Sequence, residues 1–181
     1  MMFKTKIKFI SPYLQARFSE LAKEELLKDA RKTITRNTTE EDEQWIRFSY
    51  FDNKGYYIPM EQIKMSLVYS GKDFKMKARK NSLKDWIKAT LFIKEEKCYL
   101  NKTEPDSLLT SYPKRKDGNR VKVIHPVFNI GSEIEFTIEI LEKNFDKKTL
   151  KEIIVNAGKR YALGARRPEF GRFEVLEFKE L

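Results

Sequence analysis

The sequence contains a single cysteine, Cys98, and a single histidine, His125, among its 181 residues. One cysteine excludes an intramolecular disulfide and a cysteine-based metal cluster, and this favours a reducing compartment. Cys98 itself is interpreted as a small strand residue. The carboxylates show no metal-ligand spacing, so we expect neither a metal site nor a cofactor.

Long apolar runs and nucleotide-binding motifs are also missing. No stretch approaches the roughly 20 apolar residues of a membrane-spanning helix. The first residues carry no apolar run after their charges, so no signal peptide is predicted. The sequence also lacks a Walker loop, a dinucleotide fingerprint after a strand and a nucleophile elbow. We therefore expect a soluble, cytoplasmic protein without a membrane-spanning segment.

Positive charge and aromatic residues are what the sequence has in excess. Lys and Arg number 37 against 27 Asp and Glu, which gives a formal net charge of +10, and there are 13 Phe and eight Tyr. A positive excess raises the affinity for polyanions and the rate of encounter with them. Nucleic acid is the favoured partner class, ahead of an anionic membrane surface.

The hydrophobic pattern predicts a single α+β domain over residues 1–181. Apolar residues alternate with Lys4, Lys6 and Lys8 in the first strand, and a helix follows Pro59. The core elements are predicted as strand 3–10, helix 60–70, strand 120–125, strand 133–140, helix 147–161 and strand 172–178. This βαββαβ order is ferredoxin-like or RRM-like, with an antiparallel sheet and both helices on one face.

The remaining segments, approximately 11–58 and 72–119, are predicted to be basic insertions. We expect a hairpin of strands at 45–51 and 56–58, further strands at 90–93 and 97–100, and a mobile loop at 32–44. Lys72–Lys88 is the most basic window and interleaves Phe74 and Trp86. These aromatic rings are candidates for stacking on nucleic-acid bases.

A glycine- and arginine-rich loop, Gly158–Arg172, precedes the last predicted strand. It combines four arginines and a lysine with three glycines, one glutamate and Phe170. Glycine permits close backbone approach, fixed cations bind phosphate, and a ring stacks on a base. The loop therefore suits a sugar-phosphate chain. The alternative is an ordinary connection between helix and strand with solvated arginines.

Two segments resemble the RAMP superfamily, the ferredoxin-like RNA-binding proteins of CRISPR effector backbones and guide-RNA-processing endonucleases. Tyr57–Leu67 is similar to the start of that family's first helix, and Gly164–Arg172 is similar to its glycine-rich loop. Arg167–Val175 also resembles the ending of small stand-alone relatives in phage and mobile-element genomes. The sequence departs from the family at residues 60–62 and at Met65, where the family has small residues and glycine.

The resemblance implies that Lys64 and the 164–172 loop contact RNA and that the basic insertions rim the groove. Neutralisation of phosphate charge would supply the affinity. The candidate nucleic-acid-binding residues are Lys64, Lys72, Lys75, Lys77, Arg79, Lys80, Arg115, Lys116, Arg120, Lys159, Arg160, Gly164, Arg166, Arg167, Phe170 and Arg172.

Catalysis has weak support in the sequence. His125 is the one weak catalytic candidate, but it precedes Pro126 at a predicted strand end and is interpreted as structural or surface-exposed. No loop aspartate stands out as a nuclease residue. We therefore expect no enzymatic activity.

The sequence favours a non-catalytic protein that binds single-stranded nucleic acid, preferably RNA, alone or as a repeating subunit along the strand. Its partners would be single-stranded RNA or DNA, with self-association or a nucleoprotein complex. One alternative is a phage-encoded interaction protein or decoy that docks on a CRISPR-type nucleoprotein complex. Others are a single-stranded DNA-binding protein of recombination or replication and a metal-independent endoribonuclease using His125 or a lysine.

Overall fold

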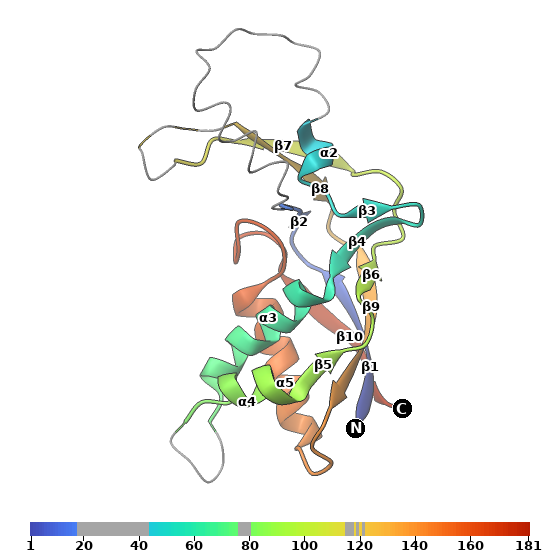
Figure 1. The fold of residues 1–181 in the computed structure, drawn as a ribbon, viewed down its shortest axis with the longest axis vertical. Helices are drawn as coiled ribbons and strands as arrows, with labels where there is room; N and C mark the ends of the chain where they lie inside the picture. The colour runs from blue at the N-terminus through green and yellow to red at the C-terminus, as the bar shows by residue number, and fades with distance from the viewer. Residues whose placement is uncertain (18–43, 76–80, 115–117, 119, 121) are drawn as a thin grey trace, which may run out of the picture.

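The structure is a computed structural model that describes residues 1–17, 44–75, 81–114, 118, 120 and 122–181. These residues form a mixed α+β fold in which every sheet is antiparallel. Figure 1 shows helices along one side of a four-stranded sheet, with smaller sheets toward one end. No helix among the described residues is long and apolar enough to cross a membrane.

The four-stranded sheet is built around β1 (Met2–Phe9). β1 pairs with β10 (Phe173–Glu180) on one side and with β9 (Glu133–Ile140) on the other, and β5 (Leu91–Ile93) pairs with the far side of β9. The strand order is therefore β10-β1-β9-β5. Alternate residues of β1 and β9 are buried, as the period of a half-buried strand requires.

Two helices pack against the buried face of this sheet (Figure 1). α3 (Met60–Ser70) begins after Pro59, and α5 (Lys147–Asn156) continues into a π-helical turn, Ala157–Tyr161. The carboxylate of Asp146 accepts a hydrogen bond from the backbone N–H of Thr149 at 3.2 Å, which caps α5. A short helix, α4 (Lys84–Thr90), leads directly into β5.

One smaller sheet has the order β2-β8-β7, formed by β2 (Tyr13–Leu14), β8 (Val123–Phe128) and β7 (Ser107–Ser111). Tyr13 and Phe128 lie with ring centroids 6.0 Å apart, and both are fully buried. Both rings belong to the same apolar core as the large sheet. This sheet therefore packs on the end of the four-stranded one.

The other smaller sheet has the order β3-β4-β6, formed by β3 (Phe51–Asp52), β4 (Gly55–Pro59) and β6 (Lys97–Tyr99). A short helix, α2 (Gln44–Arg47), precedes it. Because β4 runs directly into α3, this sheet fixes where α3 begins.

Several predicted elements are confirmed, and two are wrong. The strand predicted at 120–125 becomes β8 and lies in a smaller sheet, while β5 takes its place beside β9. β5 falls inside the segment 72–119 that the sequence assigns to an insertion.

The strand predicted at 45–51 is instead the α2 turn followed by the short β3, because the backbone N–H of Phe48 donates to the Trp45 carbonyl. The loop predicted at 32–44 falls almost wholly outside the described residues.

The sheet face opposite the helices carries paired charges. Lys4 pairs with Glu135 at 2.9 Å and Lys6 with Glu133 at 2.7 Å. The hydrogen bond and charge of each glutamate raise the pKa of its lysine. Lys4 and Lys6 are therefore neutralised by β9, and at these positions the face presents charged pairs in place of the aromatic rings that RRM domains use.

Candidate nucleic-acid interface

The first residues of the predicted glycine- and arginine-rich loop, 158–161, belong to the π-helical turn, so the loop itself comprises residues 162–172. Gly164 has φ +79° and Gly171 has φ +75°, a region that side-chain-bearing residues rarely adopt. A Cβ at Gly164 would overlap the Leu14 carbonyl oxygen, and a Cβ at Gly171 would overlap the Leu163 carbonyl oxygen. The glycines therefore allow the loop to pack against β2 and against itself.

Backbone hydrogen bonds anchor this loop. The N–H of Ala165 donates to the Leu14 carbonyl at 2.9 Å, and the N–H of Gly171 donates to the Pro12 carbonyl at 2.8 Å. The N–H of Arg172 donates to the Ser11 hydroxyl at 2.8 Å. The loop is thus fixed at both ends.

The backbone N–H groups of Arg166 and Arg167, between these anchors, and of Gly164, just before them, donate no hydrogen bond to any described residue. The side chains of Arg166 and Arg167 are exposed and pair with no carboxylate in that part of the chain. Free N–H groups beside free guanidinium groups form an anion-binding surface.

Three shallow hollows adjoin one another between this loop, the exposed side of α3 and the β3–β4 hairpin. We call them the loop hollow, the helix hollow and the hairpin hollow, with volumes of about 560, 320 and 300 Å³. The loop hollow is lined by Tyr69, Arg160, Tyr161, Gly164, Ala165, Arg166, Arg167 and Pro168. The helix hollow is lined by Ala16, Glu61, Gln62, Met65, Tyr69, Gly164 and Arg167. The hairpin hollow is lined by Arg17, Tyr50, Tyr57, Pro59, Met60, Glu61, Glu96 and Lys97.

Together the three hollows form what we call the groove. Tyr69 and Arg167 line both the loop and helix hollows, and Glu61 lines both the helix and hairpin hollows. Along α3, the eight-residue step from Glu61 to Tyr69 rises about 12 Å. That length corresponds to about three to four phosphate spacings in a stacked strand, at roughly 3.4 Å each.

Cations and tyrosines dominate the lining of the groove. Its charged residues are Arg17, Lys97, Arg160, Arg166 and Arg167 on the positive side, and Glu61 and Glu96 on the negative side. Its rings are Tyr50, Tyr57, Tyr69 and Tyr161. Aromatic rings that alternate with cations are the usual lining of surfaces that bind single-stranded nucleic acid.

A hydrogen-bond network holds the rings at the loop end. Tyr69 and Tyr161 are stacked, with centroids 6.4 Å apart and 16° between their planes. The Tyr161 hydroxyl donates to Asp73 at 3.1 Å, and the side-chain amide of Asn156 donates to the same carboxylate at 2.9 Å. The hydrogen bond from Asn156, followed by that from Tyr161, lowers the pKa of Asp73. Burial, followed by the hydrogen bond to Asp73, raises the pKa of Tyr161.

Gln15 holds the rings at the hairpin end. Its buried side chain accepts a hydrogen bond from the Tyr50 N–H at 2.8 Å and donates one to the Tyr57 carbonyl at 2.9 Å. Arg17 lies 5.9 Å from the Tyr50 ring centroid, and the Lys97 ammonium lies 4.7 Å from that of Tyr57. Each cation is therefore seated beside a ring.

The structure brings several predicted binding residues together at the groove. Arg160, Gly164, Arg166 and Arg167 line it directly. Arg166 lies 5.4 Å from the ring centroid of Phe170 in the same loop, and Lys72 lies 5.0 Å from that of Tyr69. The Arg172 backbone anchors the loop, and its side chain is exposed.

Other predicted residues lie away from the groove. Lys64 is 4.5 Å from the Phe92 ring centroid, at the edge strand β5. Lys75 lines a separate hollow with Trp86, whose ring stacks on Phe145 at 4.2 Å. Arg120 is exposed and forms an isolated bridge with Lys114. Lys77, Arg79, Lys80, Arg115 and Lys116 lie outside the described residues.

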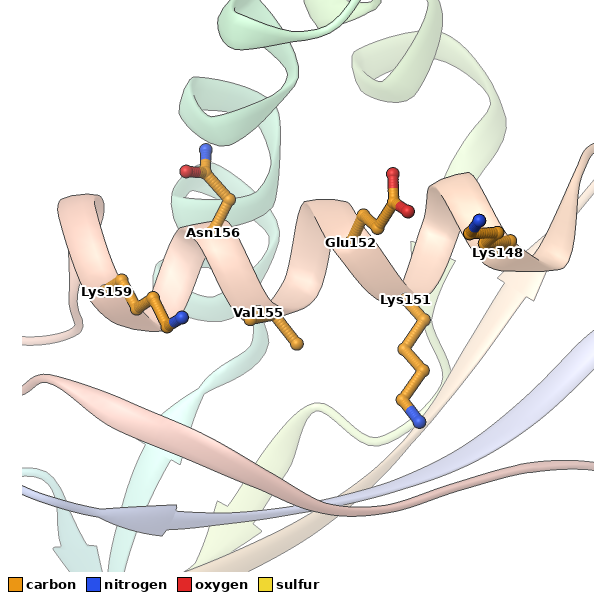
Figure 2. A pocket seen from close by; sticks show the side chains of 6 residues that line it. All are labelled: Lys148, Lys151, Glu152, Val155, Asn156 and Lys159. Atoms are coloured by element: carbon orange, nitrogen blue, oxygen red, sulfur yellow. The ribbon is translucent and has the colours of Figure 1, made fainter.

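Lys159 belongs to a separate basic surface along α5 and the π-helical turn. It lines a hollow of about 400 Å³ with Lys148, Lys151, Glu152, Val155 and Asn156. Figure 2 shows Lys151, Val155 and Lys159 on one side of the helix and Glu152 and Asn156 on the other. This hollow shares no lining residue with the groove, so Lys159 is separated from Arg160 despite being its neighbour in the chain.

His125 is buried in β8, with 7% of its surface exposed. Its Nδ1 lies 2.9 Å from the Gln15 carbonyl oxygen, and its Nε2 lies 3.1 Å from the Ser111 hydroxyl. Burial lowers the pKa of His125. Both ring nitrogens are thus engaged within the protein, which supports the structural interpretation over a catalytic one.

The described residues hold no group of three or more His, Cys, Asp or Glu side chains that could bind a metal ion. Cys98 is buried in β6, and burial raises the pKa of its thiol to about 12. A thiol with such a pKa stays protonated near neutral pH and is a poor nucleophile.

Sequence reasoning missed the tyrosines and the exposed side of α3. Glu61, Met65 and Tyr69 recur at helical spacing, while Ile63, Leu67 and Ser70 are buried. That period was visible in the sequence and could have placed Tyr69 on the exposed side. Nothing local in the sequence brings Arg17, Tyr50 and Lys97 together, because they come from different segments of the chain.

No family model matches the sequence, and no curated protein matches it. Among solved structures, the chain is similar to one in a structure described as a Type IV-B CRISPR complex. The TM-score is 0.52 and the sequence identity is 10%, over 99% of this chain and 90% of that chain. At this identity the likeness concerns the fold, which is therefore similar to that of a CRISPR complex component.

Proposed function

We propose that this chain is a non-catalytic RAMP-type protein that binds single-stranded nucleic acid, preferably RNA, along the groove. The observation that carries this proposal is the joining of three hollows into one track with cations and tyrosines at both ends. The proposal includes a ferredoxin-like core, which consists of β1, α3, β5, β9, α5 and β10. The remaining segments are insertions that supply the hairpin end.

The charge distribution favours the groove over the sheet face opposite the helices. On the opposite sheet face, Lys4, Lys6 and Lys94 are paired with glutamates. In the groove, Arg166 and Arg167 have no such partner among the described residues. An arginine without such a partner breaks no ion pair within the protein when it binds a phosphate.

The aromatic lining of the groove favours a single strand over a duplex. Single-strand binders combine a basic track with rings on which bases stack, and here the rings are spread along the track. A duplex would keep its bases paired and stacked on each other, and the rings would have no base face to contact.

The test is a fluorescence-anisotropy titration of the purified protein, freed of co-purified nucleic acid. Matched single-stranded RNA, single-stranded DNA and duplex of about 12 nucleotides are compared at about 50 and 200 mM salt. We expect tight, salt-sensitive binding to single-stranded RNA. Preference for DNA would support the recombination or replication alternative, and equal weak binding to all three would refute the proposal.

A second candidate is an adaptor that docks on a CRISPR-type nucleoprotein complex. It is favoured by the likeness in fold to a chain of such a complex over almost the whole length of this protein. This function predicts weak binding to free RNA and co-purification with a protein subunit in a pull-down. Strong binding to free RNA without any protein partner would contradict it.

A further inference from the structure

The two ends of the groove differ in chemistry. The charged residues that line the loop hollow are all arginines, whereas the hairpin hollow also contains Glu61 and Glu96. A carboxylate repels a phosphate, so Glu61 and Glu96 are unsuited to contact the strand's backbone, whereas the cations Arg17 and Lys97 of the same hollow attract it. An ionised carboxylate can instead accept hydrogen bonds from the N–H donors of a ligand.

Both carboxylates are exposed, and no described residue engages them. Neither Glu61 nor Glu96 forms an ion pair or a side-chain hydrogen bond with any described residue, although both share the hollow with Lys97. The Lys97 ammonium is instead bound to Asp52 at 2.6 Å, and the hydrogen bond from Lys97 is the main cause that lowers the pKa of Asp52 to about 2. Lys97 is thereby held away from the glutamates by a fixed partner.

The backbone brings the two glutamates to one place. The N–H of Met60 donates to the carbonyl of Glu96 at 3.1 Å, which joins the start of α3 to the turn before β6. Glu61 follows Met60 in the first turn of α3, where a negative charge also complements the helix dipole. That role accounts for Glu61 alone and leaves Glu96 unexplained.

The same hollow contains stacking surfaces. Tyr50 and Tyr57 lie with ring centroids 5.9 Å apart, and Gln15 holds the backbone of both. The volume of about 300 Å³ is at the lower end of the range for small-ligand sites, roughly 300–1,000 Å³. Rings beside a free carboxylate pair are suited to a nucleobase that is stacked and read by its edge.

We propose that the hairpin hollow is a base-reading site that selects guanine through Glu61 and Glu96. This inference rests on the proposed function and names the base that the groove prefers at one end. Guanine donates from N1–H and from its N2 amine on one edge, which matches carboxylate acceptors. Adenine and cytosine offer one amine beside an acceptor nitrogen. Uracil offers one N–H between two carbonyl oxygens, which the carboxylates repel.

The first experiment uses the unmodified protein. Anisotropy titrations compare an oligouridylate of about ten nucleotides with versions that carry one guanosine or one inosine at the 5′ or the 3′ end. We expect guanosine at one end to raise affinity about 5- to 150-fold, the range of a good bidentate base contact. Inosine lacks the N2 amine, so its affinity should fall between those of guanosine and uridine. Equal affinity for guanosine and inosine, or no guanosine effect, would overturn the inference.

The second experiment changes the carboxylates. The double variant Glu61→Gln with Glu96→Gln should lose the guanosine preference, while its affinity for oligouridylate rises because negative charge has been removed from the groove. The control is Glu174→Gln, on an exposed strand position outside the groove, which should keep the preference. A preference that survives in the double variant would overturn the inference.

The two proposals fail in different ways. If no oligonucleotide binds, the proposed function and this inference both fail. If all oligonucleotides bind with equal affinity, the base-reading site alone is wrong, and the groove binds nucleic acid without regard to the base.

Discussion

Tyr69 occupies the central position in the groove. It lines both the loop and helix hollows, stacks against Tyr161 and lies 5.0 Å from the Lys72 ammonium. Its ring is half-buried, so one part is held by the protein and another is open to a ligand. A ring held in this way loses little conformational freedom when a base stacks on it.

We therefore predict that Tyr69→Ala weakens binding of single-stranded RNA by about 1–3 kcal/mol, the usual contribution of one stacked base. Because tyrosine is uncharged, the slope of log affinity against log salt should not change. Anisotropy titrations at several salt concentrations measure both quantities. Tyr112→Ala, at a tyrosine that is 58% exposed outside the groove, is the control and should leave both unchanged. A changed salt slope in Tyr69→Ala would show that the loop itself has moved.

Asp52 links the β3–β4 hairpin to β6. Its carboxylate accepts hydrogen bonds from the Lys97 ammonium at 2.6 Å, the Tyr99 hydroxyl at 2.9 Å and the Lys54 N–H at 2.9 Å. The bond from Lys97, followed by that from Lys54, lowers the pKa of Asp52 to about 2. Asp52 therefore stays ionised at pH values well below the ordinary pKa of an aspartate.

The lowered pKa predicts acid sensitivity at this site. An aspartate whose pKa is lower in the folded state stabilises the protein above its unfolded pKa of about 3.9, and this stability is lost as the pH falls toward 2. Asp52→Asn should therefore reduce the free energy of unfolding at pH 7, and the difference from the unmodified protein should shrink at about pH 2–3. Urea denaturation at the two pH values measures this. Glu174→Gln is the control, and an Asp52→Asn deficit that does not depend on pH would contradict the assignment.

The segment between α5 and β10 shows the role of local conformation. Gly164 has φ +79°, and a Cβ there would meet the Leu14 carbonyl oxygen and the Tyr13 ring. Gly118 has a similar φ of +88°, but a Cβ there would have nothing within 4 Å. The two positions separate the cost of a left-handed backbone from the cost of lost contact.

We predict that Gly118→Ala costs only the backbone penalty, about 1–2 kcal/mol. Gly164→Ala should cost more, because the loop must also withdraw from β2. It should also weaken RNA binding, since Arg166 and Arg167 would move with the loop. Urea denaturation and anisotropy titrations measure the two effects. Equal destabilisation by the two substitutions would show that contact with Leu14 does not hold the loop.

The elements with strong local periodicity were predictable from the sequence. Glu133–Ile140 alternates throughout, and the sequence prediction and the structure agree on its bounds. The π-helical continuation of α5 fell within the predicted helix 147–161. In these elements the pattern of neighbouring residues along the chain determines the secondary structure.

Sheet membership was not predictable, because it depends on distant partners. Residues 120–125 alternate like a core strand, yet β8 pairs with β2 and β7, whereas the short β5 completes the large sheet. Only three residues of β5 pair with β9, too few for alternation to stand out. The groove was hidden for the same reason, since its rings come from α3, the π-helical turn and the β3–β4 hairpin.

At the scale of the whole molecule, the question is whether the net charge of +10 or its arrangement binds nucleic acid. The groove and the α5 hollow are both basic, but they share no lining residue. The α5 hollow includes the exposed Lys148 and Lys151 (Figure 2). Neutralising two cations at either site lowers the net charge equally, so the two changes form a matched pair.

We predict that Arg166→Ala with Arg167→Ala weakens RNA binding and flattens the slope of log affinity against log salt by about 1–2 units. Each phosphate contact with a single strand contributes roughly 0.7 units, and the arginine side chains would account for two such contacts. Lys148→Ala with Lys151→Ala should leave the slope nearly unchanged, although it removes the same charge. Titrations at several salt concentrations measure both slopes. If the two double variants flatten the slope equally, binding depends on net charge alone, and the groove is no more than a junction between loop, helix and hairpin.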